Sequence, residues 1–158
     1  MKNRNILHKD DWATPPYFYD ELNKEFNFDF DPCPFHHNIY DWDGLKVDWG
    51  KRNFINPPYS RKLKESFVIK AIEESKKGKL CVMLLPVSTS TQLFHKYILP
   101  NKKEIRFIEK RIKFIGNNTK GQWVNWHLWD DKERFGIKYV KNSGMHDSMI
   151  VVFDGRIQ

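Results

Sequence analysis

The stretch RNFINPPYS, residues 52–60, places two prolines directly behind a short apolar run. Proline has no backbone N–H to give to a sheet ladder, so the strand predicted over 53–55 has to end at Asn56. An Asn-Pro step also favours a turn. Two interpretations are open at this point: a rigid turn with an exposed Tyr59, or a preorganised site at the carboxyl end of a sheet strand.

Helix and strand patterns alternate on both sides of this stretch. Phe18, Leu22 and Phe26 recur at fourfold spacing, which is typical of one apolar helix face. The run KLCVMLLPV, 79–87, is apolar throughout, as in a strand buried on both faces. The other predicted elements are helices at 60–78 and 89–100, and strands at 26–31, at 149–153 and, as a short pair, within 103–115. This alternation predicts an α/β fold with a mostly parallel sheet flanked by helices, in which ligands bind at the carboxyl ends of the strands.

The composition of the 158-residue chain fits one folded domain with a moderate positive charge. It has 27 Lys and Arg against 20 Asp and Glu, a net charge of +7, which fits either a polyanion partner such as nucleic acid or a merely well-solvated surface. We expect a flexible polar arm over 1–11 and a compact single domain over 12–158. The two cysteines make no disulfide framework, the start has no apolar signal region, and no run is long enough to span a membrane. We therefore expect a reduced, cytoplasmic protein.

Five blocks of sequence resemble, in order, the phage-type DNA N6-adenine methyltransferase family. They are DDWATPPYFYDEL (10–22), FNFDFDPCP (26–34), DGLKVDWGKRNFINPPYS (43–60), VMLLPVSTSTQLFH (82–95) and RIKF (111–114). The resemblance implies a class I, Rossmann-like methyltransferase fold encoded by a phage or its bacterial host. It also implies methyl transfer from S-adenosylmethionine to the N6 amine of adenine in DNA, with the adenine flipped out of the duplex.

In this family Asn56, Pro57, Pro58 and Tyr59 would form the catalytic motif. The residues themselves suit that role, because the two prolines stiffen a frame of oxygen acceptors beside an aromatic face, which fits a planar ligand with an exocyclic amine. The resemblance implies that Asn56 and Pro57 hydrogen-bond the target amine and draw its nitrogen toward a nucleophilic, pyramidal state. Tyr59 would stack on the base.

The resemblance also implies a set of cofactor-binding residues, and each has a plainer structural interpretation. Asp31, Pro32 and Cys33 stand where the family places a cofactor motif, although an Asp-Pro turn would look the same. The glycine-rich loop usual in class I enzymes is missing, which leaves open which part of the cofactor Asp31 would hold.

Trp12, Thr14 and Pro15 match an element that lies against the cofactor, while Thr14 is also a plausible helix N-cap. Asp43 is a candidate for the ribose or a turn residue before glycine. A zinc site built on Cys33 and its two neighbouring histidines is rejected, because paired ligand spacings are lacking.

The segment 115–148 mixes basic residues with tryptophans, a pattern typical of contacts to DNA backbone and bases. We therefore expect nucleic-acid contacts from Arg111, Lys120, Trp126 and Lys132. A strand pair that buries the tryptophans is equally consistent with the sequence. Rival functions are methylation of cytosine N4 or of RNA adenine, and a non-catalytic nucleic-acid-binding module.

Overall fold

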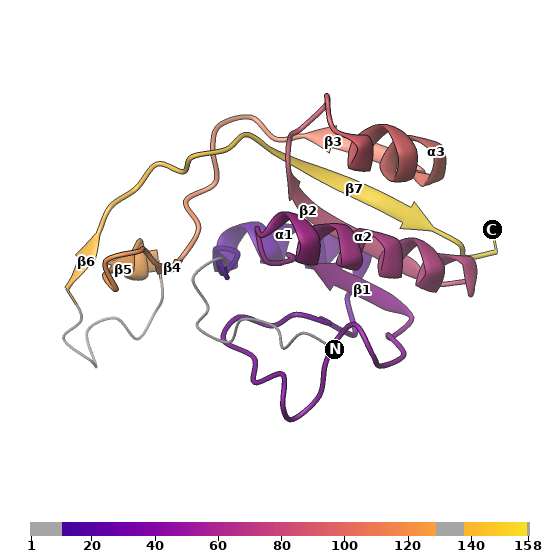
Figure 1. The fold of residues 1–158 in the computed structure, drawn as a ribbon, viewed down its shortest axis with the longest axis horizontal. Coiled ribbons are helices and arrows are strands. Elements are labelled where there is room, and N and C mark those ends of the chain that lie inside the picture. Colours follow the sequence, from indigo (N-terminus) through magenta and orange to yellow (C-terminus); the bar gives the residue numbers. More distant parts are fainter. Residues whose placement is uncertain (1–10, 129–137, 158) are drawn as a thin grey trace.

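The computed structural model describes residues 11–128 and 138–157, and a four-stranded sheet lies at its centre (Figure 1). The strand order is β1-β2-β7-β3. These strands are β1 (Arg52–Ile55), β2 (Leu80–Pro86), β3 (Glu104–Phe107) and β7 (Ser148–Asp154). The arm expected over 1–11 lies outside the described residues, apart from Asp11.

Alternating side chains of β2 supply both halves of the core. Cys81, Met83 and Leu85 face one apolar cluster, to which α2 (Arg61–Lys76) and the π-helix η1 (Leu93–Ile98) contribute. The side chains between them, Leu80, Val82 and Leu84, face a second cluster under α1 (Pro16–Phe26). The continuous apolar run of β2 is thus buried on both faces, as the sequence predicts.

The predicted class I, mostly parallel sheet is wrong. Within this four-stranded sheet only β1 and β2 pair in parallel, and β7 is antiparallel to both β2 and β3. The cause lies in the connection 108–147, whose described residues form no crossover α-helix. The Ile108 N–H donates to the carbonyl of Ser148 over 3.0 Å, so β7 begins where β3 ends and must run back alongside it.

Helices and short strands also differ from the prediction. Among the described residues the α-helices are α1, α2 and the three-residue α3 (Leu99–Asn101), which follows η1. The strand expected at 26–31 shrinks to one parallel bridge between Phe30 and Asn53, because α1 runs to Phe26 and Asn27 takes a left-handed conformation. Of the two strands expected within 103–115, only β3 forms. No described helix has the length and apolar character needed to cross a bilayer.

A second, small sheet stands apart from the first, at the left of Figure 1. It contains β4 (Gly116–Asn117), β5 (Trp123–Val124) and β6 (Tyr139–Val140), and the 3-10 helix η2 (Trp126–Leu128) follows β5. The buried side chain of Asn125 holds its base together. The Asn125 Nδ2 donates to the carbonyls of Phe114 (2.9 Å) and Asn142 (2.8 Å), and its Oδ1 accepts from the Asn142 N–H (2.9 Å).

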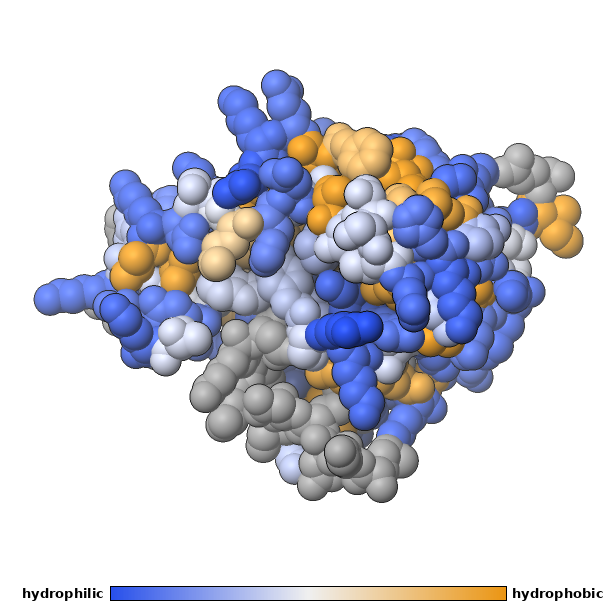
Figure 2. Space-filling model, turned by 45° about the horizontal axis from the view of Figure 1, so that its top comes forward, coloured by the Kyte–Doolittle hydropathy of each residue, from blue (hydrophilic) through white to orange (hydrophobic). Residues whose placement is uncertain are grey.

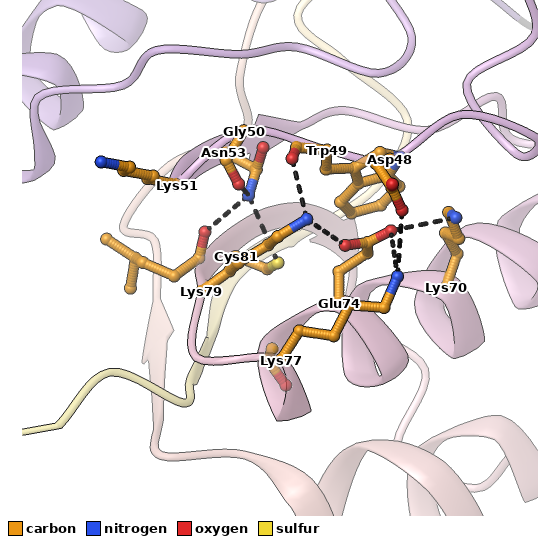
Figure 3. Close-up of polar contacts among 12 residues, drawn as sticks. Asp48, Trp49, Gly50, Lys51, Asn53, Lys70, Glu74, Lys77, Lys79 and Cys81 are labelled. Atoms are coloured by element: carbon orange, nitrogen blue, oxygen red, sulfur yellow. Dashed lines mark hydrogen bonds and ion pairs between the residues drawn. The ribbon is translucent and has the colours of Figure 1, made fainter.

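Buried ion pairs tie α2 to the amino end of β2 (Figure 3). The fully buried Glu74 carboxylate contacts the ammonium groups of Lys70 (3.0 Å), Lys77 (3.3 Å) and Lys79 (2.5 Å). The Lys79 ammonium also donates to the carbonyl of Trp49 over 2.8 Å. This cluster lies at the amino ends of the strands, opposite to the edge where Asn56 leaves β1.

Candidate active site

Asn56 is the first residue after β1, and its side chain is fixed from two sides. The buried Nδ2 donates to the carbonyl of Trp12 (2.5 Å) and to the Thr14 hydroxyl (3.1 Å). A backbone carbonyl can only accept, so the amide must turn its nitrogen toward Trp12. The Asn56 Oδ1 is consequently left buried with no hydrogen-bond partner among the described residues. A buried unpaired acceptor costs stability, so it is a candidate contact for a ligand.

The prolines and the tyrosine after Asn56 form a stiff corner. Pro57 and Pro58 are buried, and Tyr59 is half-buried. The Tyr59 ring meets the rings of Phe114 and His146 edge-on, at centroid distances of 5.8 and 5.9 Å. Burial raises the pKa of the Tyr59 hydroxyl, so this hydroxyl stays neutral. Beside it lies a mainly apolar hollow of about 80 Å³.

A second hollow, of about 140 Å³, joins residues from three of the predicted sequence blocks. Asn56 borders it together with predicted cofactor residues Trp12, Thr14, Asp31 and Cys33. Sequence reasoning missed its other lining residues, which are Ala13, Tyr19, Phe35 and Phe54. Tyr19 stands on α1 one residue after Phe18, and its ring packs on Phe54 at a centroid distance of 5.1 Å.

The Asp31-Pro32-Cys33 turn is bonded directly to the Asn-Pro-Pro-Tyr motif. The Asp31 Oδ1 accepts from the Cys33 N–H (2.9 Å), and the buried Cys33 thiol donates to the carbonyl of Asn56 (3.3 Å). Burial raises the pKa of Asp31 to about 7, the hydrogen bond from Cys33 opposes this, and the nearby charge of Asp11 adds to it. A carboxyl group with a pKa near 7 at the edge of a hollow is suited to a cationic or hydroxyl-bearing ligand.

Trp12 and Thr14 reach the site because their segment pairs with Ile115, about 100 residues later in the chain. Ala13 forms an antiparallel bridge with Ile115, with N–H to carbonyl distances of 2.7 and 3.1 Å. Pro15, not Thr14, is the N-cap of α1. The Thr14 hydroxyl is turned to Asn56 instead, so the predicted helix cap is wrong at this residue.

Asp43 and Pro32 have structural roles on the loop between α1 and β1. The Asp43 Oδ1 accepts from the Leu45 N–H over 2.9 Å, which makes Asp43 a turn residue, and it does not line the hollow around Asn56. Gly44 packs so tightly on buried Pro32 that a Cβ would lie 1.8 Å from the Pro32 carbonyl oxygen. Glycine at 44 is therefore required for this loop to close.

A family model described as DNA N-6-adenine-methyltransferase (Dam) matches residues 3–126. The chain belongs to this family. It is also 40% identical over 129 residues to a DNA N-6-adenine-methyltransferase of Haemophilus phage HP1 (strain HP1c1), a match that covers 74% of this chain and 73% of the relative. No solved structure matches the chain significantly. The prediction of a DNA adenine N6 methyltransferase is confirmed, and with it the need for a methyl donor.

The residues expected to touch DNA are spread around the second sheet of the methyltransferase. Arg111 donates to the Asp147 carboxylate over 3.3 Å, Lys120 is exposed in a turn, and half-buried Trp126 packs on Trp123 at 4.5 Å. Lys132 lies outside the described residues. Hydrophilic side chains cover most of the face drawn in Figure 2.

A polar hollow of about 240 Å³ adds two further lysines to this region of the methyltransferase. Exposed Lys113 and Lys141 line it together with Asn125, His127, Asn142 and Ser143. Within the part of the chain that the structure describes, no three His, Cys, Asp or Glu side chains gather closely enough to hold a metal ion.

Proposed function

We propose that the methyl donor is S-adenosylmethionine and that it binds in the hollow between Asp31, Thr14 and Asn56. The observation that carries this proposal is the buried Asn56 Oδ1, which has no partner among the described residues and borders the hollow. When bound, the cofactor supplies an electrophilic methyl group on a sulfonium. The Asp31 carboxylate offers a counter-charge for a methionine ammonium or an acceptor for ribose hydroxyls, and the ring of Trp12 offers an apolar wall.

In this proposal Asn56 acts on the substrate amine. The Asn56 Oδ1 accepts one N–H of adenine N6, while its Nδ2 stays bonded to Trp12 and Thr14. The carbonyl of Pro57 accepts the second N–H. Two acceptors on a proline-stiffened frame hold the amine in one orientation and draw its nitrogen toward a nucleophilic state before transfer. Tyr59 then stacks on the base, which has to leave the duplex to arrive there.

Replacing Asp31 with asparagine tests the cofactor site. Asparagine keeps the acceptor for the Cys33 N–H, so the turn should survive, but the negative charge is lost. We expect S-adenosylmethionine to bind about 10- to 150-fold more weakly at pH 8, which corresponds to about 1.5–3 kcal/mol for a hydrogen bond to a charged group. Calorimetry measures this directly. An unchanged dissociation constant would move the contact to another residue.

The pH dependence gives an independent check on Asp31. Because the folded pKa lies near 7, wild-type cofactor affinity should rise as the pH increases through 7 and then level off, and the asparagine variant should lack this rise. The folding stability of the cofactor-free protein should depend on pH in the opposite direction. A raised pKa means that the folded state holds the proton more tightly, so stability should fall as the pH rises from about 4 to 7.

We also propose that residues 12–158 act as one methyltransferase domain and that 115–148 contacts the DNA. Replacing Lys120 and Lys132 with alanine should flatten the dependence of log affinity on log salt by up to about 2, if each neutralises one phosphate. Trp126→Ala should instead lower affinity by about 1–3 kcal/mol with the salt slope intact. Titrations at several salt concentrations, with thermal melts, measure both. Unchanged slopes together with a destabilised Trp126 variant would leave the segment structural.

A further inference from the structure

A hollow of about 400 Å³, larger than those described above, opens between α2, η1 and the carboxyl end of β2. Its floor is apolar and includes Leu85, Phe94 and Met149, and its rim is polar. The rim residues are Arg61, Lys64, Glu65, Ser88, Thr91 and Gln92. None of the residues assigned above to catalysis or to cofactor binding lines it.

The positive charges on this rim are not balanced by the residues that the structure describes. Arg61 and Lys64 face the hollow with Glu65 as its single carboxylate, and no ion pair joins them to any acid that the structure describes. Lys64 is half-buried, and burial followed by the neighbouring charge of Arg61 lowers its pKa. Exposed Arg61 and half-buried Lys64 thus stand side by side with no described ion-pair partner, and an anion bound between them would favour both charged forms.

The helix geometry favours an anion at the same place. The first turn of α2 contains Arg61 and Lys64 and no acidic residue, so both cations stand at the positive end of the helix dipole. Cations at this end of a helix lower its stability, whereas an anion bound there would interact favourably with the helix dipole. Hydroxyl and amide donors at Ser88 and Gln92 border the same space.

The hollow opens at the edge of the sheet that carries the catalytic motif. β1 and β2 run in parallel with Ile55 beside Met83, so Asn56 and the loop after Pro86 leave the sheet in the same direction. Only four residues separate Asn56 from Arg61, and the first two of them are the stiff pair Pro57-Pro58. A substrate bound at Asn56 therefore has its flanking atoms near this rim.

We propose that this hollow binds a phosphodiester of the DNA strand that carries the target adenine, with Arg61 and Lys64 as the phosphate contacts. This inference rests on the proposed placement of the adenine at Asn56. The adjoining sugar would lie against the apolar floor and the ring of Tyr97, which also lines the hollow. The site would fix the register of the strand, since phosphate contacts position DNA without reading its sequence.

The test compares Arg61→Met and Lys64→Met, singly and together, with Lys62→Met as the matched control. Methionine keeps an apolar stem of similar length, and Lys62 stands in the same helix turn but does not line the hollow. DNA affinity is measured by fluorescence anisotropy at several salt concentrations, on a duplex containing a site that the wild type is first shown to methylate. The same duplex is then made with a neutral methylphosphonate at each position around the target adenine.

We expect the double variant to bind DNA about 10-fold or more weakly and to lose about 0.9 from the salt slope, the share of one phosphate. A methylphosphonate at one position should weaken DNA binding by the wild type and by the Lys62→Met control while leaving binding by the double variant unaffected.

The inference is overturned if the wild type methylates the duplex but the double variant keeps its salt slope and responds to every methylphosphonate as the wild type does. It is also overturned if the double variant loses S-adenosylmethionine affinity in place of DNA affinity, because the hollow would then hold the cofactor carboxylate. Failure of the proposed function is distinct, since it would appear as a wild type without cofactor binding.

Discussion

Asn56→Ala is expected to lower kcat for methyl transfer by about 10²–10³-fold, the loss typical when one preorganised hydrogen-bonding group is removed from an active site. The alanine variant lacks the Oδ1 proposed to hold the target amine. It also releases the Trp12 carbonyl and the Thr14 hydroxyl, which the Nδ2 holds in the wild type. Single-turnover transfer of a labelled methyl group to DNA measures the effect.

Thr14→Val separates the two functions of the Asn56 side chain. This variant removes the 3.1 Å bond to Nδ2 but keeps both the Oδ1 and the bond to Trp12, so we expect kcat to fall by no more than about 10-fold, in line with one neutral hydrogen bond. Melting curves of both variants control for folding. An Asn56→Ala protein with a near-normal kcat would refute the role assigned to the motif, and equal losses in both variants would place the effect in the bond between Thr14 and the Asn56 Nδ2, which both variants lose.

Glu74→Ala is expected to cost about 3 kcal/mol of unfolding free energy without altering the chemistry of transfer. The change leaves three ammonium groups without their shared carboxylate, and removing one partner of a buried ion pair typically costs about 3–5 kcal/mol. We expect a loss at the lower end of this range because the ammonium group of half-exposed Lys77 can turn to water. The mostly buried ammonium groups of Lys70 and Lys79 account for the cost that remains. Denaturant unfolding measures the difference.

Glu73→Ala is the matched control, because Glu73 is the exposed neighbour on the same helix and its removal should change stability by less than about 0.5 kcal/mol. Acid gives a second measure. Burial raises the pKa of Glu74, but hydrogen bonds from Lys79, Lys70 and Lys77 outweigh it and hold the value at about 2, below the ordinary 4.5. The stabilisation that the Glu74 carboxylate gives to the folded state should therefore be complete above pH 4.5 and lost as the pH falls toward 2. Equal acid sensitivity in the wild type and Glu74→Ala would contradict this.

Several of the predicted site residues border one hollow because they belong to short motifs at element ends. Prolines after Asn56 and after Asp31 mark where extended chain must stop, and strand ends gather at one edge of a sheet. The hollow that contains Asp31, Cys33 and Asn56 follows from that geometry. Tyr19 and Phe54 were missed because their contribution depends on which side of α1 and β1 faces the opening, and local spacing does not fix this.

Strand direction could not be read from the sequence in the same way. The apolar run of β2 reports burial on both faces, and this pattern is the same whether the neighbouring strand runs parallel or antiparallel. Direction depends on the path of the 108–147 connection, which returns to its starting edge without a described crossover helix. The alternation over Phe26–Asp31 predicted a strand that does not form, for a related reason. Phe26 and Asn27 belong to the end of α1 and its cap, and Phe30 alone pairs with a neighbouring strand.

The contact between Ile108 and Ser148 has an evolutionary consequence. It brings the two ends of a forty-residue excursion together at one hydrogen bond, so the main sheet constrains the excursion only at these ends and at the residues that pack back onto it, such as Ile112, Phe114 and Ile115. Doubling the length of such an excursion costs only about 0.6 kcal/mol in closure entropy. The family model ends inside it, at residue 126. Lineages can thus lengthen, trim or exchange the exposed part of this excursion while inheriting an unchanged sheet.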